Sequence, residues 1–153
     1  MKIFFKENYL HILLVTLLAL LFVFWGRTVV REIKLNTNTQ MLHTLEARLN
    51  CLKSYGWTVD EGSETRRDTA IPDPLDDVWE AYNALQTVCG FDLRKYQGKK
   101  VTCYTYIAQN FPYDVGAPVY INLLICDGNL IGGDCMTTAL DGFMLPLDRR
   151  YLP

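Results

Sequence analysis

The stretch that decides the fold of this chain is VYINLLICDGNLIGGDCM, residues 119–136. It contains two apolar runs, 119–126 and 130–136, separated by Asp127 and Gly128. Asp-Gly suits the two central positions of a tight hairpin turn, and short runs rich in Val, Ile, Leu and Tyr between turn signals are typical of strands. The stretch therefore predicts an antiparallel hairpin in which Cys126 faces Asn129.

A helix is predicted well before this hairpin, at the start of the polar part of the chain. Leu42, Leu45, Leu49 and Leu52 recur at spacings of three and four, which places them on one face of a helix. Gly56 follows, where it can end the helix by adopting a left-handed conformation. The pattern predicts an amphipathic helix packed on the rest of the domain.

A second helix begins near Asp73, which can cap its N-terminus, and Pro74 suits the first helical position. Gly90 is placed to end it. The positions expected to face the core are Leu75, Val78, Tyr82, Leu85 and Cys89.

The remaining segments before the hairpin differ in strand character. Residues 57–59 alternate like a short strand, and residues 100–107 are rich in β-branched and aromatic side chains. The charged stretch from Asp60 to Asp68 indicates an exposed loop, after which residues 69–71 return to the sheet. The order predicts an α+β domain with two helices on one face of a small antiparallel sheet.

The N-terminal part has a different composition. From Asn8 to Gly26 the chain has 19 residues without a formal charge, bounded by Glu7 and Arg27. As a helix they would span about 28 Å, close to the hydrocarbon thickness of a bilayer. The run ends in bulky residues and Arg27 rather than in a small-residue cleavage site, which favours an uncleaved signal-anchor over a signal peptide.

These patterns divide the chain into an anchor with flanks at 1–34, a linker at 35–40 and a domain at 41–153. Flanking basic residues are nearly balanced across the anchor, and a long domain behind a short tail crosses largely regardless of charge. We therefore expect a single-pass cell-membrane protein with its domain outside. Beyond Lys34 the net charge is −5, which offers no basic surface for nucleic acid.

A series of short runs is spread over the domain: SYGWTV at 54–59, Ile71-Pro72, Tyr82-Asn83, GFDL at 90–93 with Tyr96 and Gly98-Lys99, YTY at 104–106, NLL at 122–124, IGGD at 131–134 and DGFM at 141–144. In this order the runs resemble a bacterial family known as domain of unknown function 4830. The resemblance covers about residues 42–145. It implies a small domain behind a signal or anchor on Gram-positive-type bacteria, without an agreed activity. The layout is also similar to the cystatin or PepSY folds, an analogy that does not license function.

Catalytic side chains are scarce. Beyond the anchor, His43 is the one histidine, and Ser54 and Ser63 are the two serines. A Ser-His-Asp or Cys-His arrangement would need His43, which the pattern places on the first helix. A calcium site at Asp73, Asp76, Asp77 and Glu80 is less favoured than capping of the second helix. No catalytic, cofactor or metal residue is assigned.

The five cysteines are Cys51, Cys89, Cys103, Cys126 and Cys135, and their spacing does not suit structural zinc. Two disulfides could form in 15 patterns, although a Cys126–Cys135 bridge is excluded because hairpin pairing separates them by roughly 20 Å. We favour buried thiols over a structural disulfide.

A possible interaction surface is formed by Tyr104 and Tyr106, which share one strand face, and by Asp134 and Cys135 in the glycine-rich run at 131–135. The alternative is that the tyrosines belong to the core and that Gly132 and Gly133 form a bulge, with Asp134 accepting hydrogen bonds from a turn. For both pairs we favour the alternative.

The leading hypothesis is a non-enzymatic, membrane-tethered module that binds a protein, peptide or envelope component outside the cell. The second is a thiol-dependent or redox enzyme that uses an exposed cysteine. The third is a partner-binding domain tethered to the cytosolic side of the membrane.

Overall fold

The computed structural model of the protein describes residues 41–139 and 141–152. The predicted anchor between Asn8 and Gly26 and the linker 35–40 lie outside these residues. Within the described ranges, no helix has the length and apolar character needed to cross a bilayer.

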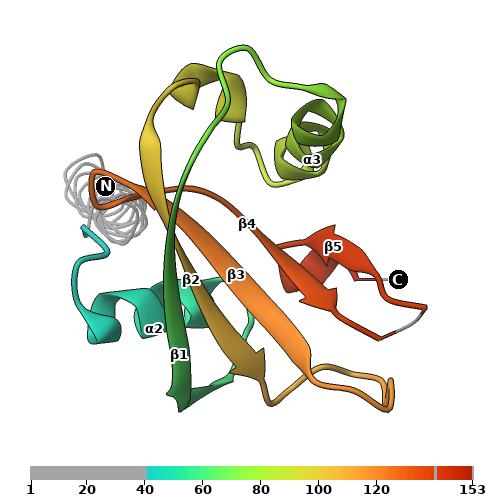
Figure 1. Cartoon of the computed structure of the whole chain (residues 1–153). Helices are drawn as coiled ribbons and strands as arrows, with labels where there is room; N and C mark the ends of the chain where they lie inside the picture. The colour runs from blue at the N-terminus through green and yellow to red at the C-terminus, as the bar shows by residue number, and fades with distance from the viewer. Residues whose placement is uncertain (1–40, 140, 153) are drawn as a thin grey trace, which may run out of the picture. The chain divides into compact units, whose positions relative to one another are not determined.

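A five-stranded antiparallel sheet forms the centre of the fold, with its strands side by side in sequence order (Figure 1). Its strands are β1 (Val59–Ala70), β2 (Lys100–Ala108), β3 (Val119–Cys126), β4 (Asn129–Thr137) and β5 (Met144–Pro146). The helices are α2 (Leu45–Ser54) and α3 (Asp77–Val88), with 3₁₀ turns η1 (Leu93–Tyr96) and η2 (Arg149–Tyr151). The α+β class and the two helices are confirmed.

The central hairpin agrees with the sequence prediction. Cys126 pairs with Asn129 across the turn, and Asp127 and Gly128 have φ values of 50° and 76°. Positive φ at both central positions is what a two-residue hairpin turn with the right-handed strand twist requires.

The glycine pair in β4 accompanies a bulge, as the favoured interpretation predicts. Leu124 pairs with Gly132 but Ile125 pairs with Leu130, so Ile131 is an additional residue in β4. A Cβ at Gly133 would lie 2.5 Å from the Asn122 carbonyl oxygen, so the strands approach too closely there for a side chain. Asp134 follows directly and is fixed in direction by this bend.

The loop predicted between Asp60 and Asp68 is wrong, because these residues belong to β1. The register shifts between Asp60 and Thr65, and from Thr65 onward each residue pairs with β2. As an edge strand, β1 needs no alternating apolar pattern, and charged residues on an edge discourage pairing with other chains. Its composition therefore hides its conformation.

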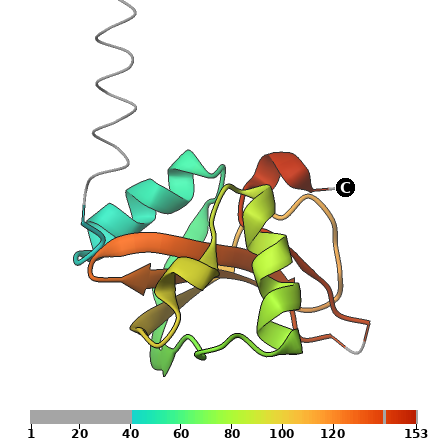
Figure 2. The same ribbon diagram turned by 90° about the horizontal axis from the view of Figure 1, so that it is seen from above.

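The two helices lie on opposite faces of the sheet, which corrects the prediction that they share one face (Figures 1 and 2). Leu52 of α2 packs in a cluster with Leu123, whereas Trp79 of α3 packs against a cluster that contains Leu124. Because successive strand residues point to opposite faces, Leu123 and Leu124 belong to two different hydrophobic cores, one on each side of the sheet.

The buried faces of the helices also differ from the predicted ones. In α2, Leu45 is 39% exposed while Ala47, Arg48 and Leu52 are buried. In α3, the buried residues are Asn83 and Gln86, and both are polar. Periodicity of apolar residues located both helices but assigned their faces only in part.

The N-terminus of α3 lies three residues later than the predicted capping residue, Asp73. Asp76 is the N-cap, and its carboxylate accepts a hydrogen bond of 2.8 Å from the Trp79 amide. The predicted core residue Val78 is 76% exposed, whereas Asn83 is 2% exposed. Gly90, with φ of 83°, follows the helix end as predicted.

Candidate functional site

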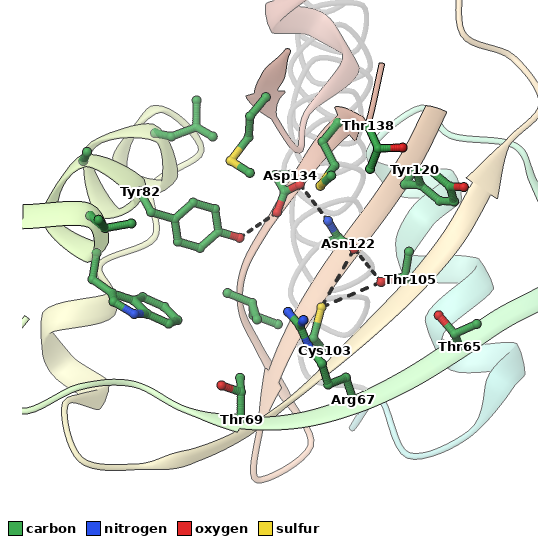
Figure 3. A pocket seen from close by; sticks show the side chains of 17 residues that line it. Thr65, Arg67, Thr69, Tyr82, Cys103, Thr105, Tyr120, Asn122, Asp134 and Thr138 are labelled. Carbon is green, nitrogen blue, oxygen red and sulfur yellow. Dashed lines mark hydrogen bonds between the residues drawn. The ribbon is translucent and has the colours of Figure 1, made fainter. Parts of the chain in front are cut away.

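A pocket of about 950 Å³ lies between α3 and the sheet. Its floor consists of side chains at alternate positions of β1 to β4, and its wall consists of one face of α3 (Figure 3). Ligand sites of small molecules have volumes of roughly 300–1,000 Å³, so this pocket has the size of such a site.

A row of polar side chains crosses the pocket floor. Strand pairing places Thr65, Thr105, Asn122 and Asp134 directly opposite one another across four strands. The Thr105 hydroxyl donates to Asn122 Oδ1 over 2.5 Å, and Asn122 Nδ2 donates to Asp134 Oδ1 over 2.8 Å. These bonds fix the orientation of the Asn122 amide and of the Asp134 carboxylate.

Asp134 ends this row, and Tyr82 of α3 reaches down to it (Figure 3). The Tyr82 hydroxyl donates to Asp134 Oδ2 over 2.7 Å, so each carboxylate oxygen accepts one hydrogen bond. Asp134 is 2% exposed. Its partners are neutral donors from a helix and a strand, not the turn amides expected from the sequence.

Burial raises the pKa of the Asp134 carboxyl above its ordinary value, although the hydrogen bonds from Tyr82 and Asn122 act in the opposite direction. Removal from water disfavours the charged form of an acid. Burial and the nearby Asp134 charge likewise raise the pKa of the Tyr82 hydroxyl. Tyr82 therefore keeps its proton, and its hydrogen bond to Asp134 connects α3 to the sheet.

Arg67 lies on the same face of β1 as Thr65 and Thr69. Figure 3 shows its side chain pointing into the pocket near Cys103. Among the described residues that line the pocket, Arg67 alone is positively charged. Burial raises the pKa of the Cys103 thiol, and a hydrogen bond with Thr105 acts in the opposite direction. The Asp134 charge raises this pKa further, while the Arg67 charge lowers it by a smaller amount.

The wall opposite the polar floor is apolar. It includes Trp79, Leu85 and the exposed Val78 from α3. Met136 from β4 and Met144 from β5 add apolar surface at the sheet side of the pocket. Val78 is 76% exposed and Met144 is 47% exposed. Large apolar side chains left in water beside a cavity can be covered by a ligand.

Of the four residues proposed as an interaction surface, only Asp134 lines this pocket. Tyr106 and Cys135 are 0% exposed and belong to the core beneath α2. Tyr104 packs against the same core, and the Arg48 guanidinium lies 4.0 Å from the centre of its ring. For the tyrosines, the core interpretation favoured from the sequence agrees with these positions.

Arg48 is the centre of a buried polar cluster on the α2 side of the sheet. Its guanidinium contacts both carboxylate oxygens of Glu64, and Nη1 donates to the carbonyl oxygens of Leu42 and His43 over 3.1 Å each. The Tyr106 hydroxyl accepts from Arg48 Nε and donates to Glu64. This satisfied network is on the face opposite the pocket and holds β1 to α2.

The histidine and serines are not assembled into a catalytic group. A Cβ at Gly128 would lie 2.7 Å from His43 Nε2, which places His43 beside the β3–β4 turn. The Ser63 hydroxyl donates to the Asp60 carbonyl and accepts from the Ile107 amide within the β1 irregularity. Among the described residues, no three acids, histidines or cysteines converge as a metal site.

All five cysteines are free thiols. Three are buried and two, Cys51 and Cys89, are half-buried. Burial raises the pKa of Cys51 to about 11, and burial with the nearby Asp134 charge raises that of Cys135 to about 12. Cys51 and Cys135 therefore remain protonated at neutral pH, and a protonated thiol is a poor nucleophile.

Sequence reasoning missed Arg67, Tyr82, Thr105 and Asn122 as members of one site. Local sequence gives no clear signal for Arg67: Thr65, Arg67 and Thr69 occupy alternate positions, but Arg66 and Asp68 between them are polar as well, so no period of two separates the strand faces. The rest depends on the pairing of four strands and on which face α3 covers, and neither is visible in local sequence.

Fold and pocket together define a small α+β protein with an amphipathic cavity between a helix and a meander sheet. The chain belongs to the family described as domain of unknown function (DUF4830), whose model matches residues 51–134. The match includes β1, α3, β2, β3 and β4 as far as Asp134. Comparison with curated proteins and with solved structures gave no match.

Proposed function

We propose that this protein is a single-pass membrane protein that presents a non-enzymatic binding domain outside the cell, and that the pocket beside α3 is its ligand site. The observation that carries the proposal is the division of the pocket into an oriented polar floor and an exposed apolar wall. Binding sites combine mostly apolar lining with a few fixed polar groups in this manner.

Binding is favoured over thiol chemistry by the state of the cysteines. Cys103 is the one cysteine among the described pocket residues, and it is 8% exposed. Burial raises the pKa of its thiol. A reactive cysteine needs an environment that lowers the pKa and admits a substrate, so this environment supports a packing role.

Photocrosslinking tests the pocket. A photoreactive benzoyl-phenylalanine is placed at Val78, in the pocket wall, or at Val88, which is an exposed valine of the same helix outside the pocket lining. After irradiation of living cells, the full chain should carry an added mass at position 78 and none at position 88. Equal labelling at the two positions, or none at either, would contradict a ligand site in the pocket.

Fractionation and protease treatment test the membrane part of the proposal. The uncharged run from Asn8 to Gly26 should keep the full chain in the membrane pellet after detergent-free lysis and ultracentrifugation. Protease added to intact cells should digest the domain if it is outside. Recovery in the aqueous fraction would contradict the anchor, and survival of the domain in intact cells would place it on the cytosolic side.

A further inference from the structure

The positive charge in the pocket has no partner of its own. Arg48, Arg66, Arg94 and Arg150 each form an ion pair with a carboxylate. The Arg67 side chain has neither a hydrogen bond nor an ion pair in the part of the chain that the structure describes. An arginine that lines a cavity with its donors free is ready to bind an anion, because its planar group matches a carboxylate.

Asp134 lines the same pocket but forms no ion pair with Arg67. Both of its oxygens already accept hydrogen bonds, from Tyr82 and Asn122, and the residue is 2% exposed. Asp134 therefore has no oxygen free to bind a ligand. Among the charged groups that the structure describes in the pocket lining, Arg67 is the one whose side-chain donors are free.

Further donors lie beside Arg67. Thr65 and Thr69 are two residues away on either side, so they share its face of β1 and line the pocket with it. Neither hydroxyl has a hydrogen bond within the described ranges. An anionic group on Arg67 could accept a hydrogen bond from either threonine.

The remaining requirement of the site is an apolar body. Val78 and Met144 expose apolar surface to the cavity, with Trp79 and Leu85 beside them on the wall. Covering this surface removes apolar area from water, which favours binding. An ion without an apolar part would leave the wall uncovered.

We propose that the ligand is a small organic acid, whose carboxylate pairs with Arg67 and whose apolar body lies against α3. The inference rests on the proposed binding function and specifies its ligand class. A cavity of about 950 Å³ accommodates a molecule of this kind.

Three probes with the same apolar part test the inference: 6-phenylhexanoate, 6-phenylhexanamide and 6-phenylhexylamine. Each is titrated calorimetrically into the full chain in lipid nanodiscs, with empty nanodiscs as the blank. The acid should bind about tenfold or more tightly than the amide, and the amine should bind most weakly, because of the charge of Arg67.

Matched variants locate the effect. Arg67→Gln should abolish the preference for the acid over the amide, whereas Arg66→Gln, on the neighbouring residue of the other strand face, should retain it. Val78→Asp should weaken binding of the acid, while Val88→Asp should leave it unchanged. Both valines are exposed, so these changes do not disturb the core.

The outcomes separate the two proposals. Equal affinity for acid and amide, weakened by Val78→Asp but insensitive to Arg67→Gln, would overturn the organic-acid inference and leave the pocket as a binding site. Preferred binding of the amine would overturn the inference in the same way. If no probe binds and the crosslinker at Val78 acquires no mass, both proposals fail.

Discussion

Two buried ionic side chains, Arg48 and Asp134, show how individual residues of this protein are accommodated. Arg48 lies beneath α2 with a carboxylate, a hydroxyl and two carbonyl oxygens around it. Asp134 lies beneath α3, where it accepts hydrogen bonds from two neutral donors and forms no ion pair with any described residue. The charge of Arg48 is compensated by Glu64, whereas Asp134 is held mainly by hydrogen bonds. Mutations at these two sites should therefore affect the free energy of unfolding in different ways.

Replacing Glu64 by alanine should lower the free energy of unfolding by about 2–4 kcal/mol, because the buried Arg48 loses its counter-charge. The measurement is a urea titration of the chain in nanodiscs, followed by intrinsic fluorescence. Asp68→Ala is the control, since both partners of its pair with Arg66 are exposed and its loss should change stability much less. Similar losses in the two variants would contradict the buried network.

Asp134→Asn should change how stability depends on pH. The folded-state pKa of Asp134 is raised above 3.8, so the folded protein favours the protonated acid and loses stability as pH rises through that pKa. The variant lacks this loss, and its stability relative to the unmodified chain should rise between about pH 4 and neutrality. Urea titrations across this pH range measure the difference.

Asp68→Asn is the control of opposite sign. Hydrogen bonds from Thr102 and Arg66 lower the pKa of Asp68, so its ionised form is favoured in the folded protein. The stability of this variant relative to the unmodified chain should fall as pH rises from below the lowered pKa to about pH 4, and should stay constant from there to neutrality. A pH-independent difference for Asp134→Asn would show that Asp134 does not titrate with a raised pKa.

At the scale of elements, the start of α3 distinguishes the sequence pattern from the structure. Asp73 and Asp76 both precede the helix, but only the Asp76 carboxylate accepts a hydrogen bond from a helix amide. Asp76→Ala should therefore lower the free energy of unfolding by about 1 kcal/mol, the usual cost of losing a cap. Asp73→Ala, measured in the same urea titration, should cost clearly less, and the reverse order would move the cap to Asp73.

Elements formed by local sequence were predictable, and those formed by long-range pairing were not. The β3–β4 hairpin follows from Asp127-Gly128 and its apolar flanks. Strand β1 was missed because β2 pairs with it and Arg48 anchors Glu64, neither of which is encoded nearby. Strand β5 has three residues, Met144–Pro146, and too short a pattern to detect.

At the scale of the whole molecule, the site was predictable only in part. Asp134 stood out because the glycines before it imply a bend. The pocket around it joins β1, α3 and four further strands, so its composition depends on the order of strands and on the face that α3 covers. The sequence favoured one face for both helices, and that arrangement would not have formed this pocket.

Thiol labelling reports on the packing of the whole domain. Three cysteines are buried, and Cys51, which is half-buried, has its pKa raised to about 11. A maleimide reagent at neutral pH should therefore label these four thiols slowly in the native chain and all five thiols quickly in denaturant. Rapid native labelling of one of these four would revive the hypothesis of a thiol-dependent enzyme.

The sheet is also a partition between two cores of different composition. On one side, Leu52 of α2 packs with Ile121 and Leu123. On the other, α3 packs against an apolar cluster and also makes polar contacts, from Tyr82 to Asp134 and from the Gly133 amide to Gln86. Directional bonds to one helix can break together without exposing the opposite core. We therefore expect α3 to lift from the sheet at a lower free energy than global unfolding, which would give a bulky ligand a route into the pocket.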